Sequence, residues 1–208
     1  RIFNYNGNSW QQLGQDIDAE LPNDYSGRSV SLTPDGSTVA IGSPSNSLVR
    51  IYNFNGDYWQ QLGQDITGAE NPFWLNYTFG ESVSISADGN KVAIGAPEAS
   101  DGRVYLYYYN VNSEWQQITS IAPNNEYDYS NSKFGKSVSI SGDGNIVVIG
   151  APYWLLNVGK IHIYDLSQDI PFEILSRVCP GLQSGGFGYS TSISSDGNTV
   201  AVGAPYID

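Results

Sequence analysis

The chain has 208 residues, a net charge of −12 and a pI near 4.2. An acidic chain repels phosphate backbones and anionic lipid heads, so we expect no nucleic-acid partner. No apolar run approaches the roughly 20 residues of a membrane helix, so we expect no membrane insertion in this segment. Few residues are charged (14%) and many are aromatic (13%), which is typical of β-rich extracellular proteins.

One stretch of sequence occurs four times along the chain. Its clearest copy reads FGESVSISADGNKVAIGAP, from Phe79 to Pro97. The residues that open the repeated strand in the four copies are Val30, Val83, Val138 and Thr191. These positions lie about 53 residues apart, which predicts an architecture built from repeats.

Each repeat predicts four short strands, which the second copy shows in order. Residues 79–86 alternate between large side chains and Gly or Ser, the period of a β-strand. Asp88-Gly89 predicts a tight hairpin turn, because Gly adopts positive φ without steric strain. Residues 92–97 form the second strand, residues 103–109 a third that is apolar on both faces, and residues 115–121 a fourth.

No segment shows helical periodicity with caps, so the sequence predicts an all-β fold. Four-stranded antiparallel units of this period favour a β-propeller, in which each unit is one blade. In the second strand of each unit, large side chains such as Val92 and Ile94 alternate with small residues such as Ala93 and Gly95. The side of the blade that carries the large residues is called its large face, and the opposite side its small face. In a propeller, the large side chains of one blade can pack on the Gly, Ser and Ala of the next.

In chain order, residues 1–18 are expected to be the outer strands of a closing blade, because they match the second half of a repeat. Residues 25–67, 79–121 and 134–176 are expected to be three whole blades. Residues 187–205 would supply the inner strands of the closing blade. Pairing of the first and last segments would make the chain a single domain, a ring of four blades with one blade split two plus two.

The repeat resembles the FG-GAP repeat, which builds the propeller of integrin α-chains and of many microbial, algal and viral surface proteins. The resemblance covers the whole chain and rests on Phe-Gly at the first strand and Gly-Ala-Pro about 16 residues later. The first repeat is degenerate. The three full matches are Phe79-Gly80 with Gly95-Ala96-Pro97, Phe134-Gly135 with Gly150-Ala151-Pro152, and Phe187-Gly188 with Gly203-Ala204-Pro205.

Integrin-type repeats often carry a calcium loop of the form DxDxDG between these two strands. Here each loop keeps one carboxylate, at Asp35, Asp88, Asp143 and Asp196. Since Ca²⁺ prefers six to eight oxygen ligands, we interpret these residues as turn formers and expect no cofactor. A weak Ca²⁺ site is conceivable only in the acidic loops between blades, which contain Asp16, Asp18, Glu20, Asp24, Glu126 and Asp128.

Two alternatives to the closed ring stay open. Propellers of the FG-GAP type usually have more than four blades, so the chain can be a fragment of a larger ring. The start at Arg1, in mid-repeat and without Met, favours an internal or processed start. Alternatively, the two end half-blades pair with another copy, which gives self-assembly through a contact that does not close.

The best candidate site is the variable residue of Phe-Gly-x-Ser. The four copies carry Arg28, Glu81, Lys136 and Tyr189. In a propeller these residues lie around the axis, at the start of the innermost strands. The pattern predicts either a polar axial ligand site or a ring of compensating charges.

Two loops between strands are rich in aromatic residues. One contains Phe73 and Trp74, and the other contains Tyr153 and Trp154. Exposed aromatic residues favour contacts with protein or sugar, and the alternative is that they pack over the blades. Asn76 begins an Asn-Tyr-Thr sequon, which is a glycosylation site if the protein is secreted by a eukaryote.

The sequence predicts no catalytic site. Its single histidine, His162, is expected to be a partly exposed strand residue, and no nucleophile, phosphate or zinc-protease motif is present. We therefore expect a non-enzymatic module, secreted or on a cell or virion surface, for adhesion or assembly with protein partners. A carbohydrate-binding propeller is the alternative function, and a hydrolase or lyase is the third candidate.

The lone Cys179 is expected to be a half-buried thiol or an intermolecular bridge.

Overall fold

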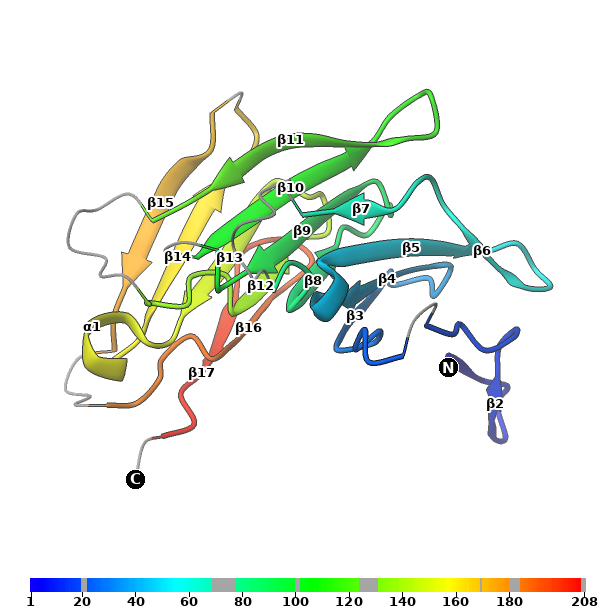
Figure 1. The fold of residues 1–208 in the computed structure, drawn as a ribbon, viewed down its shortest axis with the longest axis horizontal. Coiled ribbons are helices and arrows are strands. Elements are labelled where there is room, and N and C mark those ends of the chain that lie inside the picture. The colour runs from blue at the N-terminus through cyan, green and yellow to red at the C-terminus, as the bar shows by residue number, and fades with distance from the viewer. Residues whose placement is uncertain are drawn as a thin grey trace.

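The computed structural model describes residues 1–19, 22–68, 78–99, 102–123, 131–168, 170–179 and 184–206. Its regular structure is almost entirely β-strand (Figure 1). The strands are β1 (Phe3–Tyr5), β2 (Trp10–Gln12), β3 (Ser29–Leu32), β4 (Thr38–Ser43), β5 (Leu48–Phe54), β6 (Trp59–Gln61), β7 (Ile66–Thr67), β8 (Ser82–Ile85), β9 (Lys91–Ala96), β10 (Arg103–Tyr109), β11 (Trp115–Ile121), β12 (Ser137–Ile140), β13 (Ile146–Ala151), β14 (Lys160–Asp165), β15 (Phe172–Arg177), β16 (Ser190–Ile193) and β17 (Val200–Gly203). Two short helical turns are η1 (Pro44–Asn46) and α1 (Trp154–Asn157).

The strands form three antiparallel sheets of four main strands each and two separate hairpins. The sheet orders are β3-β4-β5-β6, with β7 also paired to β5, then β8-β9-β10-β11, then β12-β13-β14-β15. The hairpins β1-β2 and β16-β17 are two-stranded sheets of their own. The predicted all-β fold of four-stranded antiparallel blades is therefore confirmed. In the described part of the chain, no helix is long and apolar enough to cross a membrane.

An Asp-Gly turn joins the two inner strands of each repeat, as predicted. Between β8 and β9, Oδ1 of Asp88 accepts hydrogen bonds from the Ser86 hydroxyl at 2.6 Å and the Asn90 backbone N–H at 3.0 Å, while Gly89 has a φ of +72°. Equivalent hydroxyl and backbone donors lower the pKa of the other three turn carboxyls, which are Asp35, Asp143 and Asp196. Each carboxylate is satisfied within its own turn.

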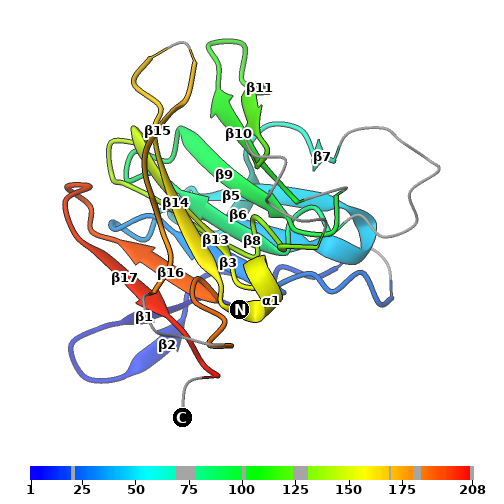
Figure 2. The ribbon, with the colours of Figure 1, turned by 90° about the vertical axis from the view of Figure 1, so that its left-hand side faces the viewer.

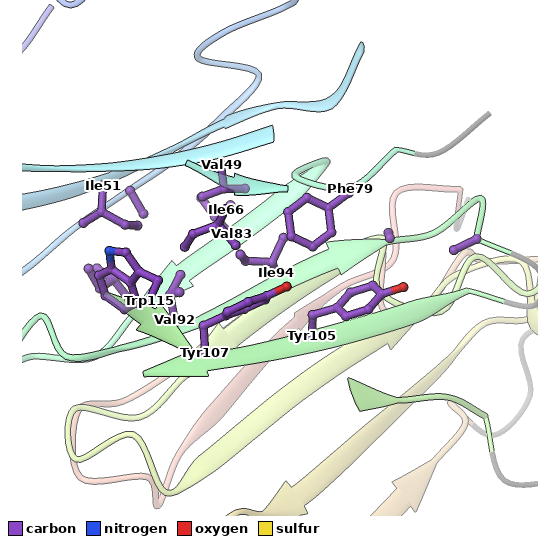
Figure 3. Close-up of a cluster of buried hydrophobic side chains, with 14 residues drawn as sticks. Val49, Ile51, Ile66, Phe79, Val83, Val92, Ile94, Tyr105, Tyr107 and Trp115 are labelled. Carbon is purple, nitrogen blue, oxygen red and sulfur yellow. The ribbon is translucent and has the colours of Figure 1, made fainter. Parts of the chain in front are cut away.

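The first strand of the repeat is shorter than predicted. β8 begins at Ser82 and not at Phe79, because Gly80 turns the chain with a φ of +89°. Phe79 is fully buried and packs edge-on against Tyr105 and Tyr107 of its own blade, with centroid distances of 5.3 and 6.4 Å (Figure 3). The Phe-Gly pair therefore anchors the chain where it enters the blade.

The core lies in layers between the blades. In the layer of Figure 3, Val83 and Ile94 on the large face of the second blade pack against Val49 and Ile51 of the first. The next layer packs the large face of the third blade against the small face of the second. Strand β10 supplies residues to both layers, which explains why it is apolar on both faces.

The small face brings the backbones of neighbouring blades into direct contact. A Cβ added to Gly95 would lie 2.1 Å from the carbonyl oxygen of Gly135 in the next blade. The Ser82 hydroxyl donates to that same carbonyl at 2.9 Å. The same arrangement joins Gly42 and Ser29 to Gly80, and Gly150 and Ser137 to Gly188.

A second repeated contact joins the outer edges of the blades. The Gln64 side chain makes two hydrogen bonds with the backbone of Trp115, at 2.7 and 2.9 Å, and the Trp115 indole N–H donates to the Leu62 carbonyl at 2.8 Å. Gln15 and Leu13 hold Trp59 in the same way. This clasp accounts for the recurrence of Trp-Gln-Gln-Leu-Gly-Gln in the sequence.

The described residues do not show the predicted split closing blade. Residues 1–18 do not pair with residues 187–205, because β1-β2 and β16-β17 are separate two-stranded sheets. The two hairpins lie apart in Figure 1, where β2 is at the right, and on the same side of the molecule in Figure 2. Neighbouring blades touch at the inner glycines and also at the outer Gln–Trp clasp. The closed ring of four blades and the larger ring both stay predictions.

We expect Gly95→Ala to lower the free energy of unfolding by about 1–3 kcal/mol, because the added methyl group would push the second and third blades apart. Gly203→Ala is the matched control. Gly203 holds the same position in the last hairpin, where the nearest atoms to an added Cβ all belong to Ser190 of its own blade. Urea denaturation of both variants measures the difference, and equal losses would contradict the contact between blades.

Candidate functional site

The variable residues of the four repeats line up along one edge of the molecule, each directly before the first strand of its blade. Nη2 of Arg28 lies 3.1 Å from Oε1 of Glu81, and Nζ of Lys136 lies 2.6 Å from the same oxygen. Nζ of Lys136 also lies 5.8 Å from the ring centroid of Tyr189. The structure thus brings all four predicted residues together in a continuous row, called the axial strip below.

Glu81 is the shared anion of the axial strip. Burial raises its pKa, but hydrogen bonds from Lys136 and Arg28 outweigh this, so the pKa of Glu81 lies below its usual value. Glu81 in turn raises the pKa of Arg28. The charges therefore compensate one another in part. The side chain of Arg28 nevertheless remains 56% exposed, which leaves donors available to a ligand.

Beyond Tyr189 the axial strip continues into a group of tyrosines. The Tyr206 ring packs edge-on against Tyr189, with centroids 5.8 Å apart and an interplanar angle of 85°. Partial desolvation, together with the nearby phenols of Tyr189 and Tyr153, raises the pKa of Tyr206. Tyr153, predicted from an aromatic loop, therefore lies near Tyr206, which in turn packs against Tyr189 of the axial strip.

Tyr206 is a site residue that the sequence reasoning does not include. A signal for it is present, because Gly-Ala-Pro is followed by Tyr at both Tyr153 and Tyr206. In an antiparallel hairpin the end of the second strand lies beside the start of the first. The residue after this proline therefore has to lie next to the axial strip.

The other predicted loop contacts divide into two groups. Trp154 is half-buried against the core layer of the second and third blades, and Nζ of Lys160 lies 5.1 Å from its ring. In this structure, Trp154 therefore packs over the blade. Its neighbours Leu155 and Leu156 are exposed apolar residues of this loop. Phe73, Trp74 and the sequon residue Asn76 lie outside the described residues, so those predictions stay untested.

His162 is buried, and the expectation of partial exposure is wrong. Its Nδ1 lies 2.5 Å from Oε1 of Glu173, and its ring packs edge-on against Phe134 with centroids 5.1 Å apart. His162 holds the position that Tyr105 has in the second blade, on a strand buried from both sides. His162 is therefore buried because neighbouring blades cover both sides of its strand, although its ring is polar.

The described residues contain no group of three or more His, Cys, Asp or Glu placed to hold a metal ion. Asp16 is paired with Arg1, and its repeat equivalent Asp65 is paired with Arg50. These two acids therefore have structural partners. Cys179 is a half-buried free thiol. Of the other loop acids, Asp18 is exposed and Asp24 is buried, and Glu20, Glu126 and Asp128 lie outside the described residues.

No family model matches the sequence, and no curated protein matches it. The fold is similar to that of a "putative 6-phosphogluconolactonase" from Bacteroides uniformis, with a TM-score of 0.57 and 12% identity over 84% of this chain and 46% of that one. The fold is also similar to that of hydrazine synthase from Kuenenia stuttgartiensis, with a TM-score of 0.56 and 17% identity over 92% of this chain and 45% of that one. The chain spans about half the length of these structures. The likeness shows a propeller-type all-β fold.

We expect Glu81→Gln to lower the free energy of unfolding at pH 7 by about 1 kcal/mol, because Arg28 and Lys136 lose their shared carboxylate. It should also reduce the loss of stability in acid. The folded-state pKa of Glu81 is lowered, so its contribution is present above the unfolded value of 4.5 and is lost as the pH falls through the folded pKa.

Urea unfolding at pH 7 and at acid pH measures both effects. Glu114→Gln is the control, since Glu114 lies exposed in the turn between β10 and β11. If Glu81→Gln lost as much stability in acid as the wild type does, the ion pairs of the axial strip would not be formed in solution.

Proposed function

We propose that the chain is a non-enzymatic interaction module of the FG-GAP type, secreted or displayed on a cell or virion surface, which binds a protein partner at the axial strip. The observation that carries this proposal is the strip itself. Its side chains differ from repeat to repeat on a backbone that is otherwise repeated. The invariant residues of the repeat are occupied by contacts within and between blades.

The chemistry of the axial strip suits a polypeptide ligand. Arg28 offers an exposed planar guanidinium, which can bind a partner carboxylate through two parallel hydrogen bonds. Tyr189 and Tyr206 offer rigid aromatic surface that loses little conformational entropy on binding. Arg and Tyr are also the residue types that most often carry binding energy in protein interfaces.

The FG-GAP assignment has its own support in the contacts of the motif. Phe79 is buried at the entry of the blade, Gly80 has the positive φ that the turn requires, and Gly95 meets the next backbone. The names of the similar solved structures describe those proteins, and we transfer no reaction from them.

A carbohydrate-binding propeller is the second candidate. The observation that favours it is the group formed by Tyr153, Tyr189 and Tyr206 beside the charged residues. Sugars stack on aromatic faces and accept hydrogen bonds from neighbouring polar groups. We rank it second because the ammonium group of Lys136 lies over the ring of Tyr189.

A phage-displayed random peptide library and a printed glycan array, both probed with the purified protein, test the two candidates. We expect selected peptides to bind the wild type and to bind the Arg28→Ala and Tyr206→Ala variants at least about 10-fold more weakly, which corresponds to about 1.4 kcal/mol. The matched controls are Arg177→Ala and Tyr58→Ala, which remove exposed residues of the same types away from the axial strip.

Peptide binding that all variants share would place the interaction elsewhere and contradict the proposal. Glycan binding that Tyr206→Ala abolishes and Tyr58→Ala preserves would establish the second candidate instead. If neither probe binds the wild type, both candidates fail.

A further inference from the structure

The described residues form no Gln–Trp clasp between the second and third blades. In the second blade, Tyr109 lies opposite Trp115, which is held by the clasp with the first blade. The register of β14 and β15 places Leu166 opposite Pro171 in the same way, and the Leu166 N–H makes the backbone contact to its inner turn that the Tyr109 N–H makes. Pro171 therefore stands in the position of Trp115, with neither an indole ring nor a backbone N–H to donate.

The facing edge of the second blade differs as well. In the first blade, residues 62–65, with the sequence Leu-Gly-Gln-Asp, lie between β6 and β7 and carry the glutamine of the clasp. In the second blade only residues 118–120 occupy this place, and they belong to β11. Ser120 is bound within its own blade, where its Oγ lies 3.0 Å from Nη1 of Arg103. Both partners of the clasp are thus replaced at this interface.

A pocket lies where the clasp is missing. Its walls belong to two complete sheets, so they do not depend on where the chain begins or ends. Between the first and second blades, the matching place is filled by the rings of Tyr109 and Trp115, whose centroids are 5.2 Å apart. The smaller Leu166 and Pro171 leave it open. The lining is largely apolar and includes Leu106, Ile118, Thr119, Ile140, Leu166 and Pro171.

The pocket is partly enclosed and opens at the surface. Ile118 in its wall is 50% exposed, whereas Leu62, which also follows Trp-Gln-Gln, packs against the core layer that contains Trp115. The enclosed part measures about 30 Å³, more than the roughly 10–15 Å³ that one water molecule needs. Among the described residues of the lining Lys91 alone is charged, and its Nζ lies 3.2 Å from the carbonyl oxygen of Gly144. The pocket therefore suits the edge of an apolar ring.

The chain itself shows which group this place accepts, because an indole ring fills it at two other interfaces. The indole N–H of Trp59 donates to the Leu13 carbonyl at 2.8 Å. That of Trp115 donates to the Leu62 carbonyl at the same distance. Ile118, which lines the pocket, follows Trp-Gln-Gln as both leucines do.

We propose that this pocket, called the indole pocket below, binds the tryptophan side chain of a partner polypeptide. The ring enters edge-on, and its N–H donates to the Ile118 carbonyl as the indoles of the two clasps donate to Leu13 and Leu62. Since the enclosed part admits only the edge of a ring, the backbone of the partner stays at the surface and supplies the rest of the contact.

The indole pocket is separate from the axial strip. Ile140 of the pocket ends β12, whereas Lys136 of the strip directly precedes that strand, so the two sites lie at its opposite ends. The proposal does not rest on the function proposed for the strip. Peptide binding by the variants described next, which keep every residue of the strip, tests that function separately.

Fluorine NMR with two probes, fluoroindole and N-acetyl-fluorotryptophan amide, tests the pocket on the wild-type chain. Both signals are expected to broaden and shift as protein is added. The capped amino acid should bind at least as tightly as fluoroindole, because its backbone stays at the surface. Fluorotoluene should bind more weakly, since it has no N–H. The proposal is overturned if neither probe binds, if only fluoroindole binds, or if fluorotoluene binds more tightly than fluoroindole.

A charge at the mouth of the pocket gives a matched pair of variants. Ile118→Asp is expected to weaken the binding of both probes at least about 10-fold. Ile174→Asp is the control, because Ile174 is also 50% exposed and holds the same bulge position in the outer strand of the third blade. It should bind the probes as the wild type does. Equal losses in the two variants, or no loss in Ile118→Asp, overturn the proposal.

Pro171→Trp offers a second test, because the chain's own indole then occupies the pocket as Trp115 does one blade earlier. Probe binding is expected to fall at least about 10-fold. Val111→Trp, which adds a tryptophan at a fully exposed valine, is the control for the added indole. Circular dichroism spectra that match the wild type show that the variants fold. A folded Pro171→Trp chain that binds the probes as tightly as the wild type overturns the proposal.

Discussion

The structure depends on the approach of one glycine to the backbone of the next blade. A Cβ at Gly95 would lie 2.1 Å from the carbonyl oxygen of Gly135, so no side chain fits at this position. The approach sets the spacing of the inner strands, and it lets the Ser82 hydroxyl reach the same carbonyl. With the inner edges fixed, the Gln–Trp clasp holds the outer edges, and the apolar layer is closed between them.

The axial strip is a geometric result of this spacing. The residue after Phe-Gly precedes the first strand of every blade, so consecutive copies lie one blade step apart. At that separation one carboxylate, Glu81, reaches both Arg28 and Lys136. The same frame carries Tyr153 and Tyr206 to the strip from the ends of the second strands. The variable side chains of the axial strip are thus held in place by the repeated glycine contacts between the blades.

Features that depend on local pattern were open to prediction from the sequence. The strands, the Asp-Gly turns and the two faces follow from alternation, and repetition identified the four strip residues. Ring closure was not predictable in this way, because the turn between blades results from many contacts across each interface, such as Trp115 with Leu62. The burial of His162 likewise depends on neighbouring strands and not on its own polarity.

The clasp between Gln64 and Trp115 has a consequence for how such a gene can change. Each blade recognises only the blade before it and the blade after it, as in other repeat proteins. Recombination that inserts or deletes a whole unit of about 53 residues leaves every surviving interface with its proper partner. Recombination that inserts or deletes only part of a unit would instead separate the tryptophan of a Gln–Trp clasp from the glutamine that binds it. Length in this lineage can therefore vary in whole units, while the boundaries of the unit stay fixed.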